Sequence, residues 1–385
     1  SGSWQVCIIG KDAAGNRQAA ADATSYSWEY DSGEPTALIT STSANPTRDG
    51  TIPVTVTFNE DVSGFFVGDV NIAGGTASNF TGSNTSYSFD VSPTAAGTLT
   101  IDVPAGGAVD SSGNTNLAAT QFSIVYDNVP PSGTSISIAG GADYINDTGV
   151  TLTLAATDVS EMYLTNTAGC ATGGSWESYG TVKPWVIAQT NSTATVYGKF
   201  RDALGNESSC ISDTIIQDSV APVAVLGQTP DNPTNSASYD IDVETDDGVD
   251  SYQFALIVSE AQCSAASYNG TWIDAGTNIS GNLSDQGSWQ ICVIGKDEAG
   301  NAPSPGQATA YTWLYDNMQP TLAFATEITS PTKETTIPVT ITFSEAVTGF
   351  VVDDLNVAGG NVANFTGINT GYSFELTPTA AGTLT

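Results

Sequence analysis

The stretch IPVTVTFNEDVSGF, residues 52–65, alternates apolar and polar side chains through its first seven positions. Period-two alternation is typical of an antiparallel strand with one buried and one exposed face. The stretch returns as IPVTITFSEAVTGF at residues 337–350, an offset of 337 − 52 = 285 residues. The chain is therefore predicted to repeat a strand-based unit along its length.

Two further phrases keep the same offset. GSWQVCIIGKDAAGN begins at Gly2 and GSWQICVIGKDEAGN at Gly287, while PTAAGTLT begins at both Pro93 and Pro378. The offset of 285 is kept without a gap to the last residue, so the final 385 − 285 = 100 residues align with the first 100. We interpret the chain as a window onto a longer array, a little over one period wide.

Four short phrases divide the period, and each places an Asp at a strand end with a Pro three or four residues later. The Asp residues are Asp31, Asp127, Asp218 and Asp316, at intervals of 127 − 31 = 96, 218 − 127 = 91 and 316 − 218 = 98 residues. Proline ends a sheet ladder and stiffens a short connector. The predicted segments are the end of a type C module (1–34), module A (35–130), module B (131–221), module C (222–319) and the beginning of a second type A module (320–385).

Each complete segment has room for one sandwich. Further alternating runs surround Tyr87, Leu99 and Tyr239, and no stretch of ten residues has a helical pattern. About seven short strands in roughly 95 residues are typical of an immunoglobulin-like sandwich. The predicted fold is all-β, with tandem immunoglobulin-like modules in a linear array. Another kind of all-β sandwich is the alternative.

The composition excludes several functions. The chain carries 41 acidic and 8 basic residues, a formal charge of −33, which excludes binding to nucleic acid or to anionic membrane surfaces. No apolar run is long enough to span a membrane, and no signal pattern opens the sequence. The absence of histidine excludes histidine-based catalysis and ligation in these residues. We predict no enzyme activity, and we expect Trp176, Trp185 and Trp272 to pack in cores or under disulfide loops rather than to form a carbohydrate platform.

Module A resembles the bacterial immunoglobulin-like repeats of large surface adhesins. The resemblance is carried by IPVTVTFNEDVSGF, GDVNIAGG, YSFDVSPTAAGTLTIDVPAGGAVDSSGN and the closing YDNVPP. Modules B and C resemble related repeats more loosely, through VYGKFRDALGNESSC and CVIGKDEAGN. The resemblance implies an extracellular, calcium-stiffened stalk or adhesin segment, and it implies no catalytic residues.

The five cysteines respect the predicted module boundaries. Cys170 and Cys210 lie in module B, Cys263 and Cys292 lie in module C, and Cys7 equals Cys292 less 285. We predict one disulfide in each of these two modules, with the partner of Cys7 upstream of the window. Buried free thiols are the alternative. Because Cys292 alternates with an apolar strand face, the bridges are expected to pin a loop to a sheet surface rather than to cross the core.

Acidic residues recur at matching loop positions. The phrase D-x-x-G-N occurs at Asp12, Asp110, Asp202 and Asp297, each time before the last strand of a module. Further acids follow the second strand of each module, at Glu60, Asp158, Asp246 and Glu345. In an immunoglobulin-like sandwich these two loops lie at one end, which faces the preceding linker. A tight turn explains the phrase alone, and solubility alone would explain the net charge, but not the matched positions.

Three carboxylates meeting at one junction would repel one another unless a cation lay among them, and oxygen-only ligation suits Ca²⁺. The predicted calcium ligands are Asp31 with Glu60 and Asp110, Asp127 with Asp158 and Asp202, Asp218 with Asp246 and Asp297, and Asp316 with Glu345. The expected partners are neighbouring modules and other copies in a fibre. The function predicted is a calcium-stiffened adhesin stalk on the cell surface. The alternatives are spacer modules of a secreted enzyme and a surface-layer or filament subunit.

Overall fold

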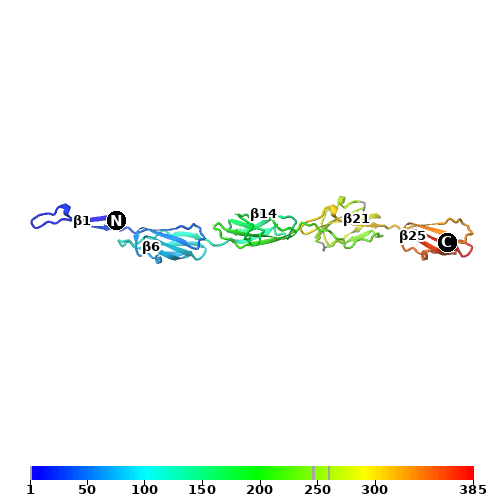
Figure 1. Cartoon of the computed structure of the whole chain (residues 1–385), viewed down its shortest axis with the longest axis horizontal. Helices are drawn as coiled ribbons and strands as arrows, with labels where there is room; N and C mark the ends of the chain where they lie inside the picture. The colour runs from blue at the N-terminus through cyan, green and yellow to red at the C-terminus, as the bar shows by residue number, and fades with distance from the viewer. Residues whose placement is uncertain (1, 245–247, 259–260) are drawn as a thin grey trace. The chain divides into compact units, whose positions relative to one another are not determined.

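The computed structural model describes residues 2–244, 248–258 and 261–385, and its regular structure consists of β-strands with a few three-residue 3-10 turns (Figure 1). The chain divides into two compact units, Ser1–Ser219 and Val220–Thr385, so the division falls in the predicted linker between modules B and C. Within the described residues, no helix is long and apolar enough to cross a membrane. The prediction of an all-β chain of several sandwiches is confirmed.

The first unit opens with an antiparallel hairpin of β1 (Gly2–Ile8) and β2 (Thr24–Tyr30), joined through the 3-10 turn η1 (Ala20–Asp22). Trp4 lies opposite Trp28 in this hairpin. The equivalent strands of module C place Trp289 opposite Trp313. The repeat of 285 residues therefore repeats in strand register as well as in sequence.

Module A is a sandwich of two three-stranded sheets. One sheet has the order β3 (Ala37–Ser41), β4 (Ile52–Val62), β6 (Gly75–Pro93), and the other has β5 (Asn71–Ala73), β7 (Gly97–Asp102), β8 (Phe122–Tyr126), with η2 (Val67–Asp69) before β5. The apolar positions of β4 point into the core, where Val56 and Phe58 are at most 2% exposed. The β4–β6 register shifts between Thr57 and Val62, so Glu60 lies within the irregular end of β4 rather than after it.

Module B packs a three-stranded sheet against a five-stranded one. The smaller sheet has the order β14 (Val182–Val186), β11 (Gly149–Thr157), β9 (Ser132–Ile138), and the larger has β10 (Tyr144–Ile145), β16 (Ile211–Gln217), β15 (Ser192–Arg201), β12 (Glu161–Thr165), β13 (Trp176–Ser178). Leu152, Leu164 and Phe200 are fully buried between the sheets. The 3-10 turn η3 (Ala168–Cys170) follows β12.

In the second unit, module C pairs β17 (Ser238–Ile241) with β20 (Ile279–Asn282) opposite a four-stranded sheet. That sheet has the order β19 (Ile273–Asp274), β18 (Ser251–Val258), β21 (Gly287–Lys296), β22 (Thr309–Tyr315). The turns η4 (Cys263–Ala265) and η5 (Pro305–Gln307) lie outside these strands. Tyr252, Ile291 and Trp313 fill the core.

The second type A segment forms one sheet, β23 (Leu322–Ala325), β24 (Ile337–Val347), β25 (Gly360–Pro378), with η6 (Val352–Asp354) between β24 and β25. Its register repeats that of module A, since Val339 lies opposite Phe374 as Val54 lies opposite Phe89. The equivalent aromatic residues also meet edge to face, Phe343 with Tyr372 and Phe58 with Tyr87.

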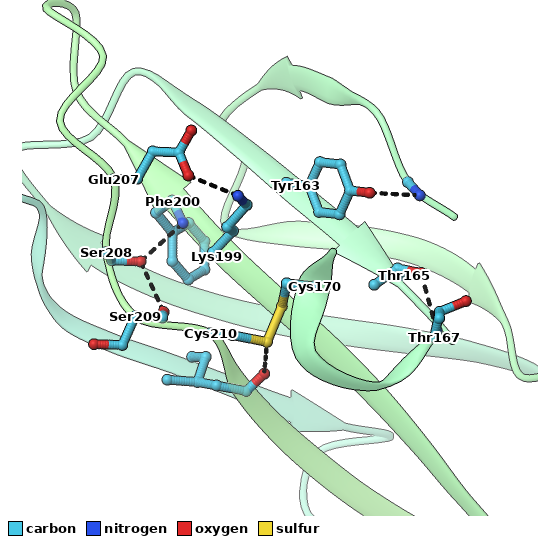
Figure 2. The surroundings of a disulfide bond; sticks show 12 residues. Tyr163, Thr165, Thr167, Cys170, Lys199, Phe200, Glu207, Ser208, Ser209 and Cys210 are labelled. Atoms are coloured by element: carbon cyan, nitrogen blue, oxygen red, sulfur yellow. Dashed lines mark hydrogen bonds and ion pairs between the residues drawn. A yellow bond between two sulfur atoms is a disulfide. The ribbon is translucent and has the colours of Figure 1, made fainter. Parts of the chain in front are cut away.

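The structure forms both expected disulfides, Cys170–Cys210 and Cys263–Cys292, and leaves Cys7 as an exposed thiol on β1. Figure 2 shows the first bridge, which joins the loop of η3 to the residue just before β16. In module C, Cys292 lies between the core residues Ile291 and Val293 along β21 but is not a member of that core cluster. Both bridges therefore pin a loop to the outside of a sheet.

Candidate metal centres

The phrase D-x-x-G-N folds into a closed turn. In module A, Asp110 Oδ1 accepts hydrogen bonds from the backbone N–H groups of Ser112 and Asn114, both at 2.8 Å. Asn114 Nδ2 donates to Asp110 Oδ2, also at 2.8 Å. Gly113 has φ of 91°, the left-handed region in which glycine carries no steric cost. These bonds fix the Asp carboxylate in one orientation at the end of the sandwich.

The same turn recurs in the other modules. Asp202 Oδ1 accepts from Leu204 and Asn206 at 2.8 and 2.9 Å, and Asn206 Nδ2 donates to Asp202 Oδ2 at 2.7 Å. Asn301 makes the corresponding bonds to Asp297 at 2.7 and 2.9 Å. The turn therefore belongs to the module fold itself, as its sequence pattern indicates.

The turn also favours the ionised carboxylate. The hydrogen bond from the Asn114 side chain lowers the pKa of Asp110, although burial acts in the opposite direction. For Asp202, burial raises the pKa, but the side-chain and backbone bonds from Asn206 outweigh it, so the pKa lies below its usual value. Both groups are anions at neutral pH. Because each carboxylate has about four acceptor positions and three are in use, one position on Oδ2 stays available to a cation.

The linker Asp before each module is held in two ways. Its own carboxylate shapes the linker, since Asp31 Oδ1 accepts from Gly33 N and Asp127 Oδ1 accepts from Val129 N, each at 2.9 Å. Its backbone carbonyl is held by the next module: Asn114 Nδ2 donates to Asp31 O at 3.2 Å. The Asn of the turn thus orients both the turn Asp and the linker.

Two groups of three carboxylates gather at these points. Asp31, Glu60 and Asp110 each offer an oxygen within 4.8 Å of the others. Asp31 comes from the linker, Glu60 from the end of β4, and Asp110 from the turn before β8. The first two are half-buried and Asp110 is buried. The cluster is what the sequence predicts for this junction, and binding of a metal to it stays a prediction.

The second group is Asp127, Asp158 and Asp202, whose oxygens also lie within 4.8 Å of one another. Asp158 follows β11 directly and has φ of 57°, a left-handed conformation that aspartate adopts more readily than most residues other than glycine and asparagine. This backbone conformation changes the direction of the chain at Asp158, directly after the end of β11. The two clusters therefore use the same three sources: a linker, the end of the second strand, and the D-x-x-G-N turn.

The remaining predicted sites are described in part. Asp246 lies outside the described residues, and Asp218 and Asp297 belong to different compact units, so this set stays a prediction. Asp316 and Glu345 line one hollow of about 490 Å³ in the second unit, together with Asn235 and Met318. Asp316 Oδ1 accepts from Met318 N at 3.0 Å, which is the linker bond seen at Asp31 and Asp127.

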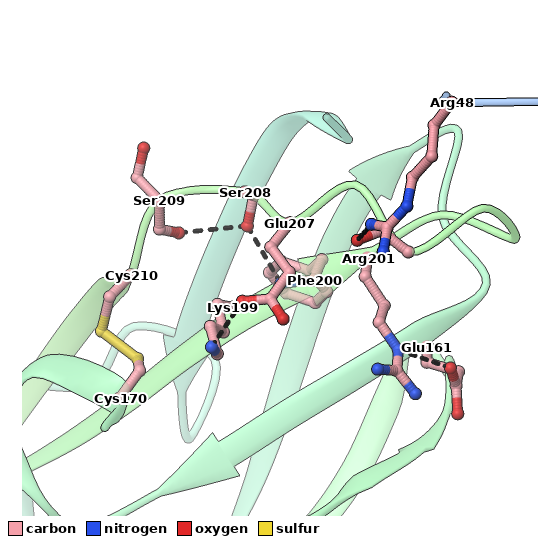
Figure 3. A network of polar contacts seen from close by, with 11 residues as sticks. Arg48, Glu161, Cys170, Lys199, Phe200, Arg201, Glu207, Ser208, Ser209 and Cys210 are labelled. Carbon is pink, nitrogen blue, oxygen red and sulfur yellow. Dashed lines mark hydrogen bonds and ion pairs between the residues drawn. A yellow bond between two sulfur atoms is a disulfide. The ribbon is translucent and has the colours of Figure 1, made fainter. Parts of the chain in front are cut away.

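The structure shows that two of the three tryptophans do not pack in a core. Arg201 lies directly before the turn Asp202, with its guanidinium carbon 4.3 Å from the ring centre of Trp176, and its Nε donates to Glu161 at 2.6 Å (Figure 3). Lys296, directly before Asp297, lies 4.5 Å from the ring centre of Trp272. Trp176 is only half-buried and Trp272 is 38% exposed, so both support cations at the sheet surface instead of filling a core. Trp185 packs against the core of module B as predicted.

Sequence reasoning missed this pairing. The signal for it is a basic residue directly before the D-x-x-G-N Asp, which occurs as Lys11, Arg201 and Lys296 but is Val109 in module A. Lys199 adds to the module B cluster, 5.2 Å from the Trp176 ring centre and paired with Glu207 at 2.6 Å. A cation over a tryptophan face contributes about 0.5–1 kcal/mol at exposed sites. The pairing therefore braces the strand that leads into the turn.

Comparison with known families agrees with this architecture. Residues 31–126 and 316–385 match the family model of the bacterial Ig-like domain. These two segments are bacterial immunoglobulin-like domains, as the resemblance of module A implies. None of the curated proteins matches the chain.

Two solved structures share low similarity with the chain. The FN1–FN3 domains of chicken CNTN1 are 12% identical, with 74% of this chain and 99% of that chain covered and a TM-score of 0.26. Domains A168–A170 of titin are 13% identical, with 70% and 95% covered and a TM-score of 0.28. Similarities this low do not bear on function.

Proposed function

We propose that this chain is a structural segment of an extracellular bacterial adhesin or surface fibre, with Ca²⁺ stiffening the joints between its modules. The observation that carries the proposal is the pair of carboxylate clusters, Asp31–Glu60–Asp110 and Asp127–Asp158–Asp202. Each cluster draws on a linker and on two segments at one end of the following module, the end of its second strand and its D-x-x-G-N turn. A cation bound there would connect the linker to the module, and bending the joint would then break coordination.

The chemistry of the clusters favours calcium. Carboxylates held this close repel one another, and the repulsion is stronger near protein than in bulk water. Calcium takes six to eight oxygen ligands in a flexible geometry, whereas Mg²⁺ requires a near-ideal octahedron. Three carboxylates leave room for backbone oxygens and water, which suits the calcium ion. Solvent on the exposed Asp158 side of the second cluster provides the entry path.

Two further observations support an extracellular structural role. Disulfides persist in oxidising environments, and the chain forms two of them. The carboxylate turns recur at equivalent places in every module, and recurrence of this kind is typical of structural sites in repeat proteins. The adhesin role itself is taken from the resemblance of module A to adhesin repeats.

Calorimetric titration of the full chain tests the proposal. We expect Ca²⁺ to bind with release of heat, Mg²⁺ to bind more weakly, and the melting temperature to rise with calcium and fall with chelator. Asp110→Asn and Asp202→Asn should each remove one binding event. Asp12→Asn is the matched control, because Asp12 forms the same turn in the hairpin but belongs to neither cluster. No binding heat and equal melting temperatures in calcium and chelator would refute the proposal.

A further inference from the structure

The loop between β3 and β4 is anchored to the linker end of module A. Thr47 is buried, its N–H donates to Val125 O at 2.9 Å, and its carbonyl accepts from Asp127 N at 2.9 Å. Asn45 Oδ1 accepts from Val125 N at 3.0 Å. The backbone of the next residue, Arg48, is therefore fixed beside the linker that leads into module B.

The side chain of Arg48 reaches the turn of the next module. Arg48 Nη1 donates to the backbone carbonyl of Gly205 at 2.7 Å, and Gly205 is the glycine of the turn that carries Asp202 (Figure 3). Asn206 Nδ2, one residue further on, donates to Asp127 O at 3.2 Å. One hydrogen bond thus runs from module A to the turn, and the other runs from the turn back to the linker.

We infer that Arg48 is a metal-independent lock on the joint between modules A and B. The guanidinium is charged at every relevant pH, so the lock also brings a fixed positive charge to the end of module B where Asp127, Asp158 and Asp202 gather. The hydrogen bond itself requires no calcium, and this part of the inference stands without the proposed function.

The joint that follows module C differs at the equivalent position. The sequence Asn45-Pro-Thr-Arg48 of module A corresponds to Asn232-Pro-Thr-Asn235 of module C. Like Thr47 in module A, Thr234 forms backbone hydrogen bonds with the last strand of its module and with the linker residue Asp316. The neutral Asn235 lines the hollow that holds Asp316 and Glu345, and no basic residue is among the described residues that line it. Among the described residues, this joint therefore lacks the cationic side chain that Arg48 supplies at the joint after module A.

Distance measurement by double electron–electron resonance on the full chain tests the inference. Spin-labelled non-natural residues at the exposed positions Thr57 and Thr153 span the joint after module A, and Ser280 and Thr340 span the joint after module C. In EGTA the first pair should give a narrow distance distribution. Arg48→Ala should broaden it, with the ratio of closed to open joints falling on the order of tenfold. The second pair should not change with this substitution.

The controls separate the lock from other effects. Arg48→Lys keeps the charge and should restore part of the narrow distribution. Lys333→Ala removes the cation at the equivalent position of the second type A segment and should leave the first pair unchanged. Equal distributions for wild type and Arg48→Ala in EGTA would overturn the inference. An absence of Ca²⁺ binding heat in the full chain would refute the proposed function and leave the lock intact, because the measurements on the first pair are made in EGTA.

Discussion

The side-chain amide of Asn206 donates a hydrogen bond to the backbone carbonyl of Asp127, 79 positions earlier in the chain, at 3.2 Å. Asn114 makes the same bond to Asp31 at 3.2 Å, across 83 positions. In both cases the asparagine also bonds the turn carboxylate. The last residue of the D-x-x-G-N phrase therefore connects a module to the linker before it, and the phrase serves the joint as well as the turn.

Loss of the Asn206 side chain should loosen the joint without unfolding module B. In Asn206→Ala, both side-chain bonds are lost, at a cost of about 1–2 kcal/mol. Hydrogen exchange of residues 202–206, followed in EGTA by mass spectrometry, should become roughly tenfold faster. Asn16→Ala removes the bond to Asp12 in the hairpin and should leave these amides unchanged. Unaltered exchange at residues 202–206 in the Asn206 variant would contradict this role.

The turn carboxylates should stabilise the chain at neutral pH and lose that effect in acid. The pKa values of Asp110 and Asp202 are lowered on folding from a usual value of 3.8. A lowered pKa in the folded state means that the stabilisation is present above the unfolded value and is lost as pH falls through the folded value. The difference in urea midpoint between wild type and Asp202→Asn in EGTA should therefore shrink below about pH 4.

A substitution at an exposed position serves as the comparison for this pH dependence. Asp353→Asn, in the exposed turn η6, is the comparison variant and should change the urea midpoint at neutral pH by little. A midpoint difference for Asp202→Asn that stays constant from neutral pH into acid would show that the turn does not favour the ionised form.

The disulfides should limit how far modules B and C extend under force. The bridged cysteines are 40 positions apart in the sequence of module B and 29 positions apart in module C. At about 3.5 Å per extended residue, reduction should add roughly 14 nm to the unfolding length of module B and roughly 10 nm to that of module C. Module A holds no cysteine, so its unfolding length should not change. Single-molecule pulling of the full chain with and without reductant measures these steps.

Module A should depend on the aromatic cluster around Phe58. The Phe58 ring meets Phe65 at 5.2 Å and Tyr87 at 6.0 Å between centroids, both edge to face. Phe58→Ala should destabilise module A by about 3–5 kcal/mol. Leu38→Ala, on the exposed face of the same sheet at 63% exposure, should change stability by less than about 0.5 kcal/mol. Scanning calorimetry should show one transition shifted by the first substitution and none by the second.

Much of the fold could be read from local pattern. The alternation of residues 52–58 predicts which side chains of β4 are buried, because successive strand residues point to opposite faces whatever lies beyond them. The 285-residue repeat predicts that equivalent strands pair in the same way, and the module boundaries predict which cysteines meet. The carboxylates that gather at the first two junctions are also those that the loop positions indicate.

Contacts between side chains distant in sequence were decided only by the tertiary structure. The Arg48–Gly205 bond joins residues 157 positions apart, and the placement of Arg201 over Trp176 depends on which strands are neighbours in the larger sheet of module B. The register shift that leaves Glu60 inside the irregular end of β4 likewise depends on pairing with β6. Periodicity in the sequence predicts on which face of the sheet a side chain lies, because that follows from strand backbone geometry alone. What a long, flexible cationic side chain touches is set by the surface that folding brings within its reach.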